Sequence, residues 1–450
     1  MNAPKHHIIQ FVCIMAMVAA IVLQGLTHGV KVKPLYNYMN QPVTYSLEKL
    51  PLNKETYDGE YQLYLAEKAW QNTGFREFFC RCYNQMAYSC FGMTDNANVV
   101  KGKNKELYLL GNLKDVTGEL LESHYATVEE AKADAQKNVA ATLALIDTLQ
   151  RHGTTFLFVF CPTKPVVYPE YLPETYKDRL ADFSLADYYI NLFKENDIPH
   201  IDFYNHFKTI KDTVAYPLYT RLGSHWAEST MPFVTDSILR KLEEVGGYKL
   251  PKVSYIAPHL SRHYSNQDGE LEPSLNLLFP LAKSKLPRPE FTLTDTLGID
   301  RPKLLVVGDG YFVPLLHSRF VDAFEYWDYW MYNQEVQSSR PFYNWKRVSA
   351  LFDAAEVLED ADIVLAIYTS NYLFNFMSGF TQSAQELFRK GCTSDQEAIK
   401  AIMESIKENA EWFKAVEQQA KEKGITVEEN LYRNAEYVLQ TEKIKKEQIK

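Results

Sequence analysis

Two short stretches of this chain carry residue types that could perform nucleophilic chemistry. His225 follows a loop, and an imidazole can take the proton of an attacking hydroxyl. Residues 303–312, KLLVVGDGYF, contain an apolar run that ends in a Gly-Asp-Gly turn. This pattern predicts a buried strand leading into a tight turn. A serine at position 310 would be a nucleophile displayed on that turn, but this chain has Gly310 there.

The elements that would position these residues alternate between strand and helix along the chain. Short apolar runs predict strands and amphipathic periodicity predicts helices, with strands at 155–160, 198–203 and 361–369 and helices at 131–152, 185–196 and 227–244. Such alternation predicts an α/β fold, a parallel sheet with helices on both faces. The carboxyl ends of parallel strands share one edge, where ligands usually bind, so the turn at 308–310 belongs at that edge.

Size and composition limit the classes of protein to which this chain could belong. The chain has 450 residues, of which 46% are hydrophobic, enough for two domains or one large domain with appendages. The net charge of −9 gives no electrostatic support to a nucleic-acid partner. Aromatic residues make up 14% of the chain, and apart from core packing they can form platforms for sugars.

The N-terminus contains a candidate membrane helix. Residues 8–26 are apolar except for Gln10 and Gln24, and the run is long enough to cross a bilayer. It is longer than the core of a signal peptide and lacks a good cleavage site. We expect an uncleaved single-pass anchor in the inner membrane, with residues 30–450 in the periplasm. A cleaved signal is the alternative.

The six cysteines form no recognisable metal or redox motif. Cys80, Cys82 and Cys90 have neither the paired C-x₂₋₄-C spacing of a zinc site nor a redox C-x-x-C. Buried thiols are expected, with one disulfide as the alternative. The sequence predicts no metal and no cofactor.

Four segments are expected along the chain. Residues 1–30 form the anchor, and residues 31–125 contain an extended lead-in, a helix at 61–92 and a hairpin at 98–110. Residues 126–390 form the α/β domain, interrupted by an insertion or linker at 250–300. Residues 391–450 form a charged helical tail.

Several motifs resemble the AlgX/AlgJ proteins, which are SGNH-hydrolase-like factors of alginate O-acetylation. The resemblance begins at 74–110, with Gly-Phe-Arg, Asn-Gln, Phe-Gly and VVKGKNKELY in succession. A strand followed by Pro-x-Lys and Tyr-Pro comes next at 155–169. Residues 222–226, LGSHW, stand where the family carries Thr-Asp-x-His-Trp. The order of the His block before the Gly-Asp block is also shared with the family.

The resemblance implies an SGNH-hydrolase-like (flavodoxin-like) fold and a role for each matching residue. His225 corresponds to the catalytic base, Gly310 to the nucleophile and Gly223 to the aspartate that orients the base; Asp309 is retained as the second candidate catalytic residue. Two of the three triad members are therefore missing, which should remove most of the nucleophilic rate. The candidate substrate-binding residues are Lys164, Trp226, Tyr311, Trp327 and Trp330.

Two hydroxyls could be considered as replacements for the missing nucleophile. Ser224 precedes His225, but neighbours on a strand point to opposite faces. Tyr311 is nearer the right place, although a phenol is an unusual acyl acceptor.

The sequence therefore favours a membrane-anchored extracytoplasmic protein of a polysaccharide O-acetylation system, with a degenerate triad. Its expected partners are an exported polysaccharide and a membrane-bound O-acyltransferase, and its expected role is binding. Two alternatives remain: an active O-acetyltransferase or acetylesterase with a non-standard nucleophile, and a structural envelope assembly protein.

Overall fold

The computed structural model describes residues 5–37, 60–295, 298–339, 346–348, 354–390 and 395–447. The chain divides into two compact units. Unit 1 comprises Met1–Leu110, Thr220–Ser224 and His263–Ser284, and unit 2 comprises Gly111–Tyr219, His225–Arg262 and Lys285–Lys450. Much of the expected extended lead-in, residues 38–59, lies outside the described residues.

Unit 2 is built around a seven-stranded mixed sheet with the strand order β10-β9-β8-β7-β11-β3-β4. Five neighbouring strands run parallel, namely β8 (Trp327–Met331), β7 (Leu304–Gly308), β11 (Ile363–Thr369), β3 (Thr155–Cys161) and β4 (His200–Asp202). At one edge, β9 (Glu335–Ser338) and β10 (Lys346–Arg347) extend the sheet in antiparallel fashion. The predicted parallel sheet is therefore confirmed, with two antiparallel edge strands added.

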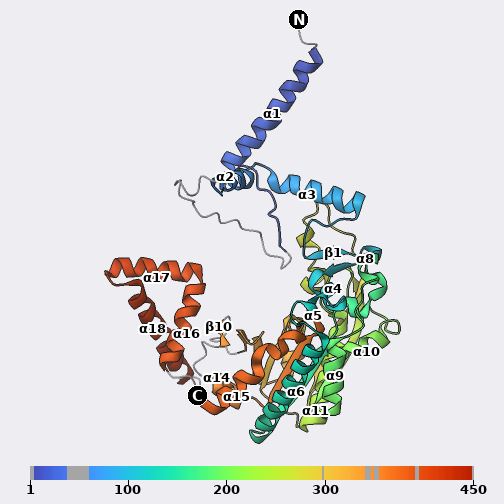
Figure 1. Cartoon of the computed structure of the whole chain (residues 1–450), viewed down its shortest axis with the longest axis vertical. Helices are drawn as coiled ribbons and strands as arrows, with labels where there is room; N and C mark the ends of the chain where they lie inside the picture. The colour runs from blue at the N-terminus through green and yellow to red at the C-terminus, as the bar shows by residue number, and fades with distance from the viewer. Residues whose placement is uncertain are drawn as a thin grey trace. The chain divides into compact units, whose positions relative to one another are not determined.

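Helices cover both faces of this sheet, as the sequence predicts. Alternate residues of β3 enter different cores: Phe156, Phe158 and Phe160 one, and Leu157, Val159 and Cys161 the other. The first core is closed by α6 (Val128–Arg151), α9 (Leu185–Glu195), α14 (Ala354–Glu359) and α15 (Phe380–Lys390). The second is closed by α10 (Phe203–Ile210), α11 (Met231–Gly246) and α13 (Val313–Leu316) (Figure 1).

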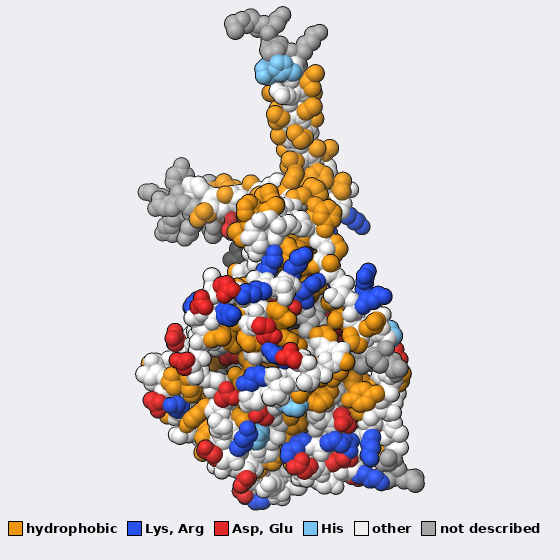
Figure 2. Space-filling model, turned by 90° about the vertical axis from the view of Figure 1, so that its right-hand side faces the viewer, with side chains coloured by type: hydrophobic (Ala, Val, Ile, Leu, Met, Phe, Trp, Pro, Cys, Tyr) orange, Lys and Arg blue, Asp and Glu red, His pale blue; other side chains and the backbone are white. Residues whose placement is uncertain are grey.

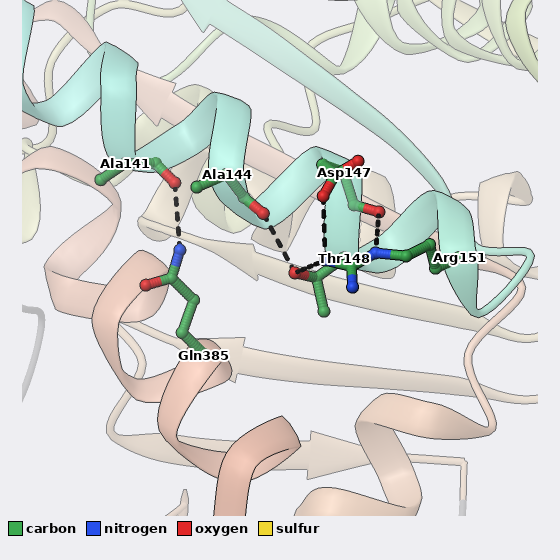
Figure 3. Close-up of polar contacts among 6 residues, drawn as sticks. All are labelled: Ala141, Ala144, Asp147, Thr148, Arg151 and Gln385. Carbon is green, nitrogen blue, oxygen red and sulfur yellow. Dashed lines mark hydrogen bonds and ion pairs between the residues drawn. The ribbon is translucent and has the colours of Figure 1, made fainter.

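Local sequence signals explain where these helices begin. Thr127 caps α6 by accepting a hydrogen bond from the backbone N–H of Glu130, and Ser184 caps α9 in the same way through Asp187. Figure 3 shows how α15 contacts α6: Gln385 Nε2 donates to the carbonyl oxygen of Ala141 at 3.4 Å. On the same helix, Arg151 pairs with Asp147 at 2.8 Å, an i,i+4 contact on the exposed side.

Unit 1 contains α1 (Lys5–Thr27), α2 (Glu60–Gln71), α3 (Arg76–Met86) and a π-helical turn, η1 (Ala87–Phe91). A short antiparallel pair, β1 (Val99–Lys101) and β2 (Leu107–Leu109), confirms the predicted hairpin. The single helix expected at 61–92 is wrong, because the chain breaks at 72–75. Phe75 there adopts φ 61, a left-handed conformation that no helix interior accommodates.

The segment at 250–300 is more ordered than the expected insertion or linker. β5 (Lys252–Ser261) and β6 (Leu286–Thr294) pair as an antiparallel ribbon in unit 2. The residues between them, His263–Ser284, belong to unit 1 and include the short helices α12 (Asn266–Gly269) and η5 (Pro273–Leu275).

The C-terminal tail is helical, as predicted, with three helices: α16 (Asp395–Glu408), α17 (Ala410–Lys423) and α18 (Val427–Glu447). Asn409 separates the first two and caps α17 by accepting from the N–H of Trp412 at 3.0 Å. These helices bury a small apolar core of their own, which includes Ile406, Val416 and Leu439.

The five cysteines in the described part of the chain are free thiols. Cys161 is buried, Cys80 and Cys82 are half-buried, and Cys13 and Cys90 are exposed, so the expectation of buried thiols holds for Cys161 alone. Cys392 lies outside the described residues.

Candidate active site

The candidate site lies in unit 2 at the carboxyl edge of the parallel strands. β7 ends at Gly308, β11 at Thr369 and β8 at Met331, and these three strands are neighbours in the sheet. The turn at 309–311 follows β7 directly, so it lies at the edge predicted from the sequence.

His225 and Gly310 are brought together. A Cβ added to Gly310 would lie 3.1 Å from His225 Nε2 and 3.9 Å from its Cε1. A serine hydroxyl at this position would therefore be within hydrogen-bonding reach of the imidazole after a shift of a few tenths of an ångström. The histidine and the turn position that the sequence resemblance assigns to a nucleophile therefore lie side by side, and the second has no side chain.

Asp309 is buried and holds the turn. Its Oδ1 accepts from the N–H of Tyr311 at 3.0 Å, and its Oδ2 accepts from the N–H and the hydroxyl of Thr369 at 2.7 and 2.5 Å. Burial raises the pKa of Asp309, while these hydrogen bonds and the charge of His225 oppose the rise. These contacts tie the turn to the end of β11, and they occupy both carboxylate oxygens.

Trp226 and Tyr311 form the wall beside the histidine. Trp226 is fully buried and donates its indole N–H to the carbonyl oxygen of Tyr311 at 3.1 Å. The rings of Tyr311 and His225 lie 4.9 Å apart between centroids. Burial raises the pKa of the Tyr311 hydroxyl well above its usual range, which makes this phenol a poor nucleophile. Tyr311 therefore packs against the histidine and is no substitute for a serine.

Tyr332 is a site residue that the sequence interpretation did not single out. Its hydroxyl would lie 3.9 Å from a Cβ on Gly310, and it accepts from the backbone N–H of Gly310. Tyr332 and Asn333 adopt φ 51 and 52 in the turn between β8 and β9. Left-handed backbone at a bulky residue costs free energy and is concentrated at functional sites. Its position immediately after the carboxyl end of β8 is the signal that could have identified it.

The two residues before His225 in the sequence, Gly223 and Ser224, belong to unit 1, and both are in close contact with other residues of that unit. A Cβ on Gly223 would lie 2.3 Å from the carbonyl oxygen of Gln267, so the backbone fills the space of any side chain. Ser224 is buried, and its N–H and hydroxyl both donate to Glu270 Oε1, at 2.8 and 2.6 Å. Gly223 therefore marks a closed space, and Ser224 serves to hold Glu270.

The other predicted binding residues lie apart from the histidine or inside the protein. Trp330 is fully buried in the core closed by α15, where its ring packs against Phe380. Trp327 begins β8, so it lies toward the opposite edge of the sheet from the turn at 309–311. Neither residue lies at the edge of the sheet where His225 and the turn at 309–311 meet, so glycan binding by Trp327 and Trp330 stays a prediction. Lys164 follows β3 at the same edge as the turn at 309–311, but its side chain is buried, with 1% exposed.

A polar network extends from the site along the loop after β11. The Thr369 hydroxyl contacts Asn371 Oδ1 at 2.6 Å, and Asn371 donates to Asn112 at 2.9 Å. Ser370 donates to Asp115 at 2.6 Å. Burial raises the pKa of Asp115 to about 6. These residues come from a helix and a loop far apart in the sequence, so no local pattern predicts the network.

Unit 2 is an α/β domain in which a histidine faces the turn after a central strand, and its class is SGNH hydrolase-like by the following match. The family model described as "SGNH hydrolase-like domain, acetyltransferase AlgX" matches residues 120–290. This part of the chain is therefore similar to the AlgX family. The matched segment contains His225 and ends before the turn at 308–310.

Three solved structures are similar to this chain. The O-acetyltransferase domain of Pseudomonas putida AlgJ is 16% identical and covers 64% of this chain and 99% of its own, with a TM-score of 0.40. Pseudomonas aeruginosa AlgX is 14% identical and covers 63% and 67%, with a TM-score of 0.40. Bacillus cereus PatB1 with a sulfonyl adduct is 13% identical and covers 55% and 93%, with a TM-score of 0.35. A search of curated proteins finds no sequence match.

Proposed function

We propose that this protein is a catalytically degenerate member of a polysaccharide O-acetylation system that binds an acetylated glycan or its acyltransferase partner. The observation that carries the proposal is the pairing of His225 with Gly310. The base stands 3.1 Å from where a nucleophile's Cβ would be, yet the residue there has no side chain. A site of this shape can still accept an acyl group beside the imidazole, but it cannot form a covalent acyl intermediate on residue 310.

The surroundings of His225 support the loss of catalysis. Ser224 donates its hydroxyl to Glu270, and Gly223 has no room for an orienting aspartate. In serine hydrolases the acidic member holds the histidine in the required tautomer, and its loss alone lowers the rate about 10⁴-fold.

The proposed location is the periplasmic side of the inner membrane. α1 contains a 22-residue apolar helix, His6–Thr27, long enough to cross a bilayer. The partners proposed on this basis are an exported polysaccharide and a membrane-bound O-acyltransferase, which would supply the acyl group that this chain cannot itself transfer. The domain divisions inferred from the sequence, 1–30, 31–125, 126–390 and 391–450, are retained as part of the proposal.

One observation favours a second candidate, an active esterase with an unusual nucleophile. The Tyr332 hydroxyl lies next to the vacant position, 3.9 Å from the Cβ site of Gly310. Burial, followed by the nearby Asp309, raises the pKa of Tyr332 above its usual range, which opposes formation of the phenolate. The degenerate assignment is therefore preferred.

Hydrolysis of 4-nitrophenyl acetate by four proteins tests both candidates: the wild type, His225→Ala, Tyr332→Phe and Gly310→Ser. We expect the first three to show the same background rate. Gly310→Ser should exceed them, because the added hydroxyl would face His225 Nε2, and adding His225→Ala should abolish the gain. A wild-type rate that falls with His225→Ala and with Tyr332→Phe would instead establish an active enzyme.

Binding is tested separately with O-acetylated and de-acetylated mannuronate oligosaccharides, by calorimetry on the wild type and on His225→Ala. Weaker binding of the acetylated form to His225→Ala, with equal binding of the de-acetylated form, supports an acetyl-recognition site. The absence of binding to any wild-type sample, in a preparation whose thermal unfolding is normal, would argue for the purely structural role.

A further inference from the structure

The helix α3 in unit 1 has an inverted distribution of polar and apolar side chains. Arg81 and Asn84 face the interior, with exposed fractions of 7% each. Phe79, Tyr83 and Met86 face outward, with exposed fractions of 46%, 53% and 53%. A surface helix of a water-soluble domain shows the reverse order, with the apolar stripe on the core.

The inward polar face is satisfied by backbone groups of unit 1. Arg81 donates to the carbonyl oxygens of Pro34 and Leu277, at 2.6 and 3.1 Å, and Asn84 donates to that of Leu275 at 3.2 Å. The orientation of α3 is therefore fixed by specific hydrogen bonds, and the outward aromatic face is a consequence of the fold.

The outward apolar face continues past the helix and into a pocket. Exposed Phe91 ends η1, and exposed Met93 lies two residues further on. Phe78 and Phe79 line a pocket of about 840 Å³ together with Leu277, Leu278 and Phe279. Contiguous apolar surface of this kind marks a site of contact with a membrane or another protein.

The chain itself fixes where this face lies relative to α1. A Cβ on Gly74 would lie 2.1 Å from the carbonyl oxygen of Ile21, and one on Gly25 would lie 2.3 Å from that of Asn72. The segment that leads directly into α3 thus touches the last turns of α1. The 22-residue apolar span, at about 1.5 Å per residue, is about 33 Å long, close to the roughly 30 Å hydrocarbon core of a bilayer.

We propose that the outward face of α3, continued by Phe91 and Met93, lies in the interfacial layer of the same bilayer that α1 crosses. This inference rests on the proposed anchoring by α1. Because the end of a spanning helix stands at the membrane surface, an element packed against that end meets the headgroups. Phe, Tyr and Met suit that layer, and Lys31 and Lys33, which follow α1, can face anionic lipid headgroups. A lipid bilayer is preferred to a protein partner because the face is continuous with α1 (Figure 2).

Depth-dependent quenching in proteoliposomes tests the proposal on the full-length chain. Single substitutions Phe79→Trp and Met86→Trp are made in a Trp70→Phe background, and the vesicles contain phosphatidylcholine brominated at shallow or deep acyl positions. The two sites are seven residues apart, about 10 Å along a helix. If α3 lies parallel to the surface, both added tryptophans should be quenched by shallow bromines to the same extent. Tyr437→Trp, a residue 74% exposed on α18, is the control and should not be quenched.

Carbonate extraction of the same vesicles separates this inference from the anchoring proposal. A protein retained by the vesicles, with both α3 tryptophans quenched, supports the inference. Retention without quenching overturns it and leaves the anchor intact; protection of these residues in native membranes would then identify a protein partner. Release by carbonate overturns the anchoring proposal and the inference with it. Unequal quenching at the two sites contradicts a helix parallel to the surface.

Discussion

Gly310 and Gly223 are both glycines at positions implied to be catalytic, and their surroundings differ. At Gly310 the neighbour is the end of a side chain, His225 Nε2 at 3.1 Å, which can move slightly. At Gly223 the neighbour is the backbone carbonyl of Gln267 at 2.3 Å. The first position can regain a side chain, and the second cannot do so without displacement of the main chain.

Gly223→Ala should therefore destabilise the fold by about 1–3 kcal/mol, as overpacked positions do. Gly111→Ala is the matched control, because a Cβ there meets nothing within 4 Å. Urea unfolding of the two variants measures the difference. Equal stability would show that residues 267–268 move freely, and Gly310→Ser combined with Gly223→Asp would then become a meaningful test of catalytic rescue.

Asp115 should make the stability depend on pH. Its pKa is raised to about 6 from 3.8, so the folded state binds the proton more tightly than the unfolded state does. The free energy of unfolding should then fall as the pH rises from about 4 to about 6, by at most about 3 kcal/mol. Asp115→Asn should flatten this decline and be the more stable protein at pH 8. Denaturant unfolding at pH 4 and pH 8 measures the effect, with exposed Asp212→Asn as the control. An unchanged pH profile would contradict the raised pKa.

At the scale of elements, much of the α/β domain could be predicted from the sequence. The strands at 155–161 and 363–369 and the helices at 128–151 and 185–195 have strong local patterns, and each lies within a few residues of its expected bounds. The break at 72–75 was missed because Gly74-Phe75 interrupts an otherwise helical periodicity. The β5–β6 ribbon was missed because its strands contain prolines and pair across more than twenty intervening residues.

The site was only partly predictable, because some of its residues are brought together by strand pairing that the local sequence does not reveal. The pairing of His225 with Gly310 follows from motif order, since both were placed by resemblance to a known group. Tyr332 and the Thr369–Asn371–Asn112 network depend on which strands are neighbours, which local pattern does not reveal. The aromatic residues of β8 were assigned to binding by composition. Strand alternation places Trp330 in the core instead.

Trp330→Ala should therefore report on the core and give no information about glycan binding. Removing a fully buried tryptophan side chain costs about 3–5 kcal/mol. Tyr326→Ala, at a residue 41% exposed just before β8, should cost much less. Thermal unfolding followed by circular dichroism compares them. A small loss for Trp330→Ala would mean that the ring is not part of the core.

At the scale of the whole molecule, the tail helices form a core that shares no residue with the two sheet cores. A chain ending at residue 390 should therefore keep the cooperative unfolding transition of the sheet. A chain ending at residue 378 should lose it, because Phe380 and Ala384 of α15 fill the first sheet core. Calorimetry on the two truncated chains measures the transitions. Loss of the sheet transition at residue 390 would show that the tail supports the sheet.

The contact between α1 and the segment that leads into α3 has a mechanical consequence. At Gly25 and Gly74 the two segments meet backbone to backbone, with no side chain between them. Because no side chain lies in this contact, none can repack when the angle between the two segments changes. A change in that angle must therefore alter the backbone conformation itself. A tilt of α1 should therefore move the segment that leads into α3 with it, and the junction between the two helices should behave as a rigid unit.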